Sequence, residues 1–205
     1  MKKEMFKELS KEVTKDGIVE EVKKAISILA LKEADVKAVS EAKKSEIYGA
    51  LIFLLPIVVN FVFALFSSYR LSFVFLLSKL FIPILAFFGA LFLIVFVAEK
   101  AFKTKLDMKA LFRVMSYSSI ATWLTVLPSL SAFVSYNSFF GFLSSTRFLV
   151  LWIFVVVFIY LSKVLKMKQN DVIVLAVSGA VAYFLAIELL IGIFIGNTYG
   201  FGFYF

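Results

Sequence analysis

The chain has 205 residues, of which 62% are hydrophobic and 18% charged, and its formal net charge is +8. Soluble domains contain about 45–50% apolar residues, so this composition, with a mean hydropathy of +0.98, indicates an integral membrane protein. The sequence has no Cys and no His. It therefore excludes disulfides, thiol chemistry, His-ligated haem and most zinc sites, and we expect no cofactor and no bound metal.

Residues 1–46 form a polar region with eleven lysines and ten acidic residues, and no apolar run in it is long enough for a signal peptide or a span. We expect short amphipathic helices, with a break at Asp16-Gly17. The second helical stripe comprises Val22, Ala25, Ile26, Leu29, Val36 and Val39. Its polar face mixes both signs of charge, which argues against a helix that binds anionic lipid. Two alternatives stay open: the helices lie on the protein's own cytoplasmic face or on a partner, or they form a solvated stem.

Residues 47–205 contain five apolar segments, and a bilayer-spanning helix needs about 20 residues. The predicted spans are 47–66, 71–98, 111–134, 146–162 and 172–196. The fourth is the shortest. The fold class is therefore all-α: a polytopic membrane protein with five transmembrane helices and an N-terminal cytoplasmic helical region.

Lysine and arginine predict the orientation of these spans, because cytoplasmic connections carry an excess of them. The second connection carries Lys100, Lys103, Lys105, Lys109 and Arg113, and the fourth carries Lys163, Lys166 and Lys168. The other two have one arginine each, Arg70 and Arg147, and the tail after residue 196 has no charged side chain. We expect a cytoplasmic N-terminus and an external or lumenal C-terminus, in the plasma membrane if the protein is prokaryotic.

Two ionisable residues lie deep in the apolar segments, Lys79 in the second and Glu188 in the fifth. Each is about eight residues from the external boundary, so both lie roughly 12 Å deep in the same leaflet. They are opposite in charge, and a structural ion pair is the leading interpretation. The alternatives are a site lining a substrate or proton path, snorkelling of Lys79, and a neutral Glu188.

The third predicted span carries hydroxyls at helical spacing: Ser118, Thr122, Thr125 and Ser129. Such a stripe is typical of helix-to-helix packing, and a polar conduit is the sharper alternative. Asn60, in the first span, is expected to form a hydrogen bond between helices rather than to bind a ligand.

The arrangement resembles the Yip family of Ypt/Rab-interacting membrane proteins, including its prokaryotic members. The residues that carry the resemblance are Tyr48 and Gly49 at the start of the first span, and Tyr117 and Pro128 in the third. The departures are Ala50 in place of a proline and Ser116 in place of a glycine. The resemblance implies five spans, an external C-terminus and a role in membrane trafficking or membrane organisation.

The sequence shows no catalytic constellation, no Gly-rich phosphate loop and no metal-spaced cluster, so we expect no enzyme and no nucleic-acid partner. We expect a scaffold or interaction protein in the lipid bilayer, with a protein partner on the cytoplasmic side or a homo-oligomer. An assembly factor for other membrane proteins would share these sequence features. The alternative is a small transporter or channel that uses the Lys79/Glu188 pair and the hydroxyl stripe.

Overall fold

The computed structural model describes residues 15–42, 45–67, 73–126 and 146–193, and these residues form helices and no strand. In chain order the elements are α2 Lys15–Ile28, α3 Glu33–Glu41, α4 Ser45–Ser67, α5 Phe73–Ala101, α6 Met108–Ser118, the 3-10 helix η1 Ser119–Thr125, α9 Thr146–Ile159, the π-helix η2 Tyr160–Val164 and α10 Gln169–Ile191. The predicted all-α class is confirmed.

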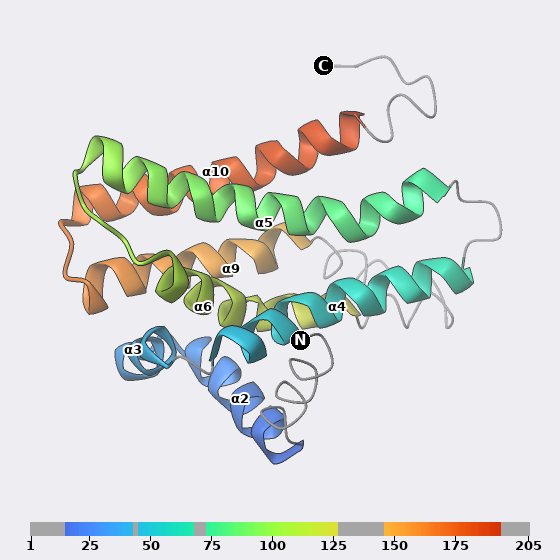
Figure 1. The fold of residues 1–205 in the computed structure, drawn as a ribbon, viewed down its shortest axis with the longest axis horizontal. Coiled ribbons are helices and arrows are strands. Elements are labelled where there is room, and N and C mark those ends of the chain that lie inside the picture. Colours follow the sequence, from blue (N-terminus) through green and yellow to red (C-terminus); the bar gives the residue numbers. More distant parts are fainter. Residues whose placement is uncertain (1–14, 43–44, 68–72, 127–145, 194–205) are drawn as a thin grey trace, which may run out of the picture.

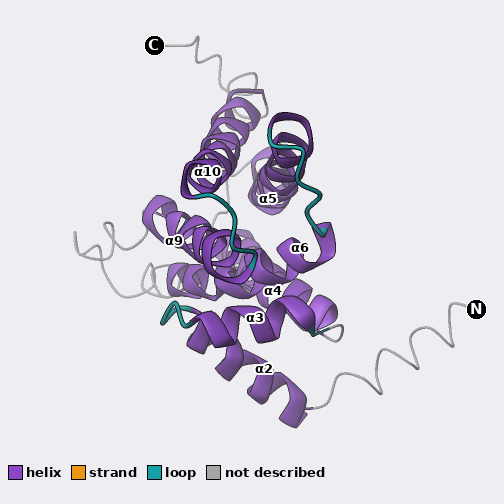
Figure 2. Cartoon of the chain, turned by 90° about the vertical axis from the view of Figure 1, so that its left-hand side faces the viewer, coloured by secondary structure: helices purple, strands orange, loops and turns teal. Residues whose placement is uncertain are grey.

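The helices are arranged in layers (Figures 1 and 2). The two long helices α5 and α10 run antiparallel and form the most extensive helix pair. Below them lie α9, α6 and α4, and the short helices α2 and α3 form the last layer. The polar N-terminal region is therefore packed on the apolar bundle: Ala25, Ile28, Val36 and Val39 are buried in the common core.

Three helices are long and apolar enough to cross a membrane: Ser45–Phe63, Leu77–Ala101 and Gln169–Ile191. They correspond to the first, second and fifth predicted spans, so the membrane class is supported. The fourth predicted span coincides with a shorter apolar helix, Leu149–Val164, in which the α-helix gives way to a π turn. The third begins as α6, with Asp107 accepting a hydrogen bond at its N-terminus, and tightens to a 3-10 helix at Ser119. Residues 127–134, with Pro128 and Ser129, lie outside the described residues.

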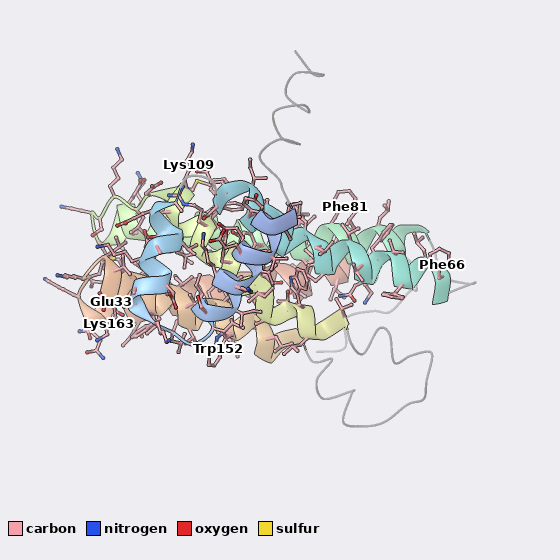
Figure 3. The ribbon with its side chains drawn as sticks, turned by 90° about the horizontal axis from the view of Figure 1, so that it is seen from below. Glu33, Phe66, Phe81, Lys109, Trp152 and Lys163 are labelled. Atoms are coloured by element: carbon pink, nitrogen blue, oxygen red, sulfur yellow. The ribbon has the colours of Figure 1, made fainter. Side chains whose placement is uncertain are left out.

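One end of the bundle is charged, and we call it the charged end. In Figure 3, Glu33, Lys109 and Lys163 lie toward this end, whereas Phe66 and Phe81 lie toward the other. Its two turns, from α5 to α6 and from η2 to α10, are built alike. Lys103 and Lys166 adopt positive φ angles of 55° and 53°. In each turn the amide three residues past the end of the helix donates back to a carbonyl of its last turns, Thr104 N to Ala98 O and Met167 N to Leu161 O.

The predicted break at Asp16-Gly17 is wrong: the described helix α2 begins at Lys15 and includes both residues.

Gly179 permits the close packing of α10 on α5 and α9. A Cβ on this residue would lie 2.5 Å from Ile94 Cδ1 and 3.0 Å from Phe154 Cε1. Both of those side chains are buried, so neither has free space to enter. Small residues at helix interfaces serve this purpose in membranes, where close packing replaces the hydrophobic driving force.

We predict that Gly179→Ala lowers the stability of the protein by about 1–3 kcal/mol, because the new methyl group overpacks the contact between α5 and α10. Thermal unfolding in detergent measures the change. Gly89 is the matched control, since a Cβ there meets nothing within 4 Å; Gly89→Ala should be neutral or stabilise by up to about 1 kcal/mol. If Ile94→Ala fails to reduce the effect of Gly179→Ala, the proposed overpacking is not its cause.

Candidate functional site

Charged and polar side chains are buried where the N-terminal helices meet the apolar bundle. The residues that make this polar junction are Glu21 of α2, Ser40 of α3, Glu46 of α4, and Arg113 and Tyr117 of α6. Four helices therefore converge on it. The burial of Glu21, Ser40 and Arg113 sets these polar groups apart from the exposed charges on the surface.

Arg113 joins the end of α3 to the start of α4. Its Nε donates to the backbone carbonyl of Ser40 at 3.0 Å, and Nη2 donates to the same oxygen. Its Nη1 donates to Glu46 Oε1 at 2.8 Å. Ser40 lies in the last turn of α3, where carbonyls lack intrahelical donors and the helix dipole is negative. The guanidinium therefore caps α3 and at the same time pairs with the carboxylate in the first turn of α4.

The hydrogen bonds to Ser40 and Glu46 offset the free-energy cost of burying the charge of Arg113. A guanidinium keeps its charge at all physiological pH values, so it cannot avoid desolvation by losing a proton. The Arg113 side chain is only 7% exposed, whereas Glu46 is 35% exposed and retains contact with solvent. Removing a partner from a buried charge costs far more than the intact pair contributes. Arg113 consequently fixes the positions of α3 and α4 relative to α6.

Glu21 makes the second connection of the polar junction. The Tyr117 hydroxyl donates to Glu21 Oε2, and Lys24 Nζ donates to the other carboxylate oxygen, Oε1, at 2.6 Å. The hydrogen bond to Glu21 raises the pKa of Lys24, against the opposing effect of partial burial. Lys24 therefore remains a cation at neutral pH, and both oxygens of the buried carboxylate are satisfied.

Gly49 and Tyr117, two of the four residues on which the resemblance rests, meet at the same place. A Cβ on Gly49 would lie 2.3 Å from Ser116 Oγ and 3.2 Å from ring carbons of Tyr117. The absence of a side chain at Gly49 thus allows α4 to approach α6 closely. Tyr48 and Tyr117 are both buried in the core. Pro128, the fourth residue of the motif, lies outside the described part of the chain.

Trp123 makes a further polar contact between η1 and α4. Its indole Nε1 donates to the backbone carbonyl of Ile52 at 2.9 Å. In an α-helix this carbonyl would accept from the amide four residues later, but that residue is Pro56, which has no N–H. The indole replaces the missing donor. At membrane depth this matters, because water is not there to satisfy a freed carbonyl.

Lys79 and Glu188 lie on the two long helices that pack against each other. The contact between Ile94 and Gly179 fixes their antiparallel register. Counted from this contact at about 1.5 Å per residue, Lys79 is about 22 Å and Glu188 about 14 Å toward the end opposite the charged end. The two residues therefore differ in level by about 8 Å along the helix axes, and both are exposed. The ion pair between them remains a prediction.

The described hydroxyls of the third segment bond to their own helix. Ser118 Oγ donates to Met115 O at 2.8 Å, and Thr122 Oγ1 donates to Ser119 O at 2.6 Å. The 3-10 helix after Ser118 has about three residues per turn, so Ser119 and Thr122 lie on the same face of it. The predicted stripe assumed α-helical spacing instead. Thr125 ends η1, Ser129 lies outside the described residues, and Asn60 is partly buried on α4.

The sequence analysis did not identify the polar junction. It treated Arg113 as a marker of a cytoplasmic connection, and it assigned no contacts to Glu21, Glu46 or Trp123. A signal for the indole contact was present, because Pro56 inside an apolar helix leaves one carbonyl without its donor. Among the described residues, no group of three acidic side chains could hold a metal ion.

Comparison with known proteins gives no relative: no family model, no curated protein and no solved structure matches the chain. The argument about function therefore rests on the polar junction itself. Its donors are matched by acceptors, and they hold helices in place. Such an arrangement positions one part of the protein against another.

We predict that Arg113→Lys weakens the attachment of α3 and α4 to α6 by about 2 kcal/mol. The ammonium group of lysine lacks the planar set of donors with which the guanidinium bonds Ser40 O and Glu46 together. Limited proteolysis in detergent should then cut residues 15–42 faster, while the core helices stay protected. Lys109→Ala is the control, since this side chain is exposed on the same helix. Equal cleavage of both variants would contradict the assigned role of Arg113.

A second prediction concerns the indole contact. Trp123→Phe should destabilise the protein by about 1–2 kcal/mol, because the Ile52 carbonyl loses its donor. In a Pro56→Ala background the backbone amide of residue 56 supplies that donor, so the same tryptophan substitution should cost less. Thermal unfolding of the four proteins forms a double-mutant cycle. Additive effects would show that Trp123 acts through packing alone.

Proposed function

We propose that the protein is a five-span membrane scaffold that presents its N-terminal helices α2 and α3 to a partner on the cytoplasmic side. In this proposal the N-terminus is cytoplasmic, the C-terminus is external or lumenal, and the charged end faces the cytoplasm. The third and fourth spans are the segments that contain α6 with η1 and α9 with η2.

The observation that carries the proposal is the fixed attachment of α2 and α3. Arg113 and Tyr117 hold this layer through buried hydrogen bonds to Ser40 and Glu21. A stem that served only as a tether would need no such contacts. The outer surface of the layer displays exposed charges of both signs, among them Glu20, Glu33 and Lys37. A rigid, mixed-charge surface of this kind suits recognition of a complementary protein surface.

Two further features support the proposal. The lysine-rich turns lie at one end of the bundle, in keeping with the positive-inside rule. In addition, two residues that carry the resemblance to the Yip family are found at the polar junction: Tyr117 belongs to it, and Gly49 lies against Tyr117. We propose on this basis that the protein is a member of that family. The polar junction would then hold the cytoplasmic helices in the other members too.

The proposal is tested by placing a photo-crosslinking amino acid at Glu33, which is exposed on α3, in the native membrane. We expect a discrete adduct with one protein, and we expect Arg113→Lys to reduce it, because that variant loosens the presenting surface. The matched control carries the crosslinker at Phe96, which is 58% exposed on the apolar helix α5. It should give lipid adducts.

Absence of a protein adduct at Glu33, or an adduct unaffected by Arg113→Lys, would contradict the scaffold. The double variant Lys79→Ala with Glu188→Ala separates it from the transporter alternative. For a scaffold, the double variant should fold and retain the adduct. Loss of solute flux in a protein that still folds would instead favour transport.

A further inference from the structure

Part of the apolar surface of helix α2 is not covered by the described residues of the protein. Ala25 and Ile28 are buried against the bundle, and Val22 and Leu29 are partly buried. On the adjoining edge of the same helix, three large apolar side chains remain outside. Ile18 is 43% exposed, Val19 49% and Ile26 56%. Glu20 lies about 100° round the helix from Val19, on the polar face, whereas Lys23 is a helical neighbour of both Val19 and Ile26 and borders the apolar edge.

The polar junction fixes the depth at which α2 lies. Glu21 is bonded to Tyr117, and Tyr117 lies against Gly49, so α2 is level with the first turns of α4. One turn further along α4, Phe53 stacks on Phe87 of α5, with ring centroids 4.1 Å apart. This contact relates the depth of α2 to the apolar length of α5.

From Phe87, the apolar stretch of α5 continues for about eleven residues, or roughly 16 Å, before Glu99 is reached at the charged end. Gly49 is only about four residues, or roughly 6 Å, from Phe53 in that direction. The level of Gly49 and Glu21 is therefore about 10 Å inside the end of the apolar part of α5. The Tyr117 side chain points back toward the N-terminus of α6, which is at the charged end. Glu21 therefore lies a few ångströms nearer to that end than Gly49 does. Helix α2 thus lies level with the apolar length of α5.

We propose that α2 is an interfacial helix whose outer edge, Ile18, Val19 and Ile26, rests among the acyl chains of the leaflet at the charged end. The occupant of this edge is lipid, because the edge lies at a depth where the neighbouring long helices are apolar. Helices in the interface bury their apolar face about 5–10 Å into the boundary between headgroups and acyl chains. Their polar face stays in water, as the placement of Glu20 requires.

This inference rests on the membrane insertion assumed in the proposed function, but not on the existence of a protein partner. It also refines that function. If one edge of α2 lies in lipid, the surface open to a partner is α3 together with the polar face of α2.

The absence of cysteine from the sequence allows the test, because a single introduced thiol carries a unique label. An environment-sensitive fluorophore is attached at Ile26→Cys and, separately, at Val19→Cys, with the full chain in nanodiscs. Glu20→Cys is the matched control on the polar face of α2. Phe96→Cys on α5 is the control for membrane insertion. Quenching is measured with lipids that carry a nitroxide near the headgroup and with aqueous iodide.

We expect the labels at Ile26 and Val19 to lose most of their emission to the lipid quencher and little to iodide, with the reverse at Glu20. Iodide quenching at Ile26 would overturn the inference, since the edge would then face water. Protection from both quenchers would also overturn it, because a second copy, residues 1–14 or a partner would then cover the edge. Failure of lipid quenching at Phe96 would instead refute membrane insertion, and with it the proposed function.

Discussion

The Arg113 guanidinium is the constraint on which the arrangement of the N-terminal helices depends. It is buried and permanently charged, so its environment must supply acceptors in a fixed geometry. Those acceptors are the last turn of α3 and the first turn of α4. The chain between α3 and α4 is therefore held at its two ends by one side chain from α6. The position of α2 depends on a second contact from the same helix, the hydrogen bond that Tyr117 donates to Glu21.

Close approach of the helices makes these contacts possible. Gly49 brings α4 against Ser116 and Tyr117, and Gly179 brings α10 against Ile94. Close packing of helices also satisfies the backbone group that is left without its partner by Pro56 in α4. The carbonyl freed by Pro56 is bonded by the indole of Trp123 from η1. Departures from α-helical geometry at membrane depth are tolerated when neighbouring helices satisfy the freed groups. Packing and polar satisfaction are thus coupled here.

The sequence allowed the long helices to be predicted, because α4, α5 and α10 are continuous apolar runs of sufficient length. The change to a 3-10 helix after Ser118 could not be predicted, since hydropathy does not distinguish the two windings. The buried position of Arg113 was missed because the positive-inside rule counts each basic residue as a boundary marker. Ile26 was placed on the same helical stripe as Ala25 by its spacing, and it is 56% exposed whereas Ala25 is buried. Periodicity gives the apolar arc of a helix but not what covers each part of it.

The buried polar contacts contribute more to geometry than to stability. A buried ion pair is often no more stabilising than well-packed apolar residues of similar volume. An apolar contact, however, is non-directional and allows a helix to slide or rotate. Arg113 has donors in a planar fork, and its acceptors lie on two different helices, so these hydrogen bonds form only when both α3 and α4 are oriented toward it. A layer that only needed to adhere to the bundle could do so through Ala25, Ile28, Val36 and Val39. The directional contacts are needed if the orientation of α2 and α3 matters, as it does for a surface that must meet both a partner and a leaflet.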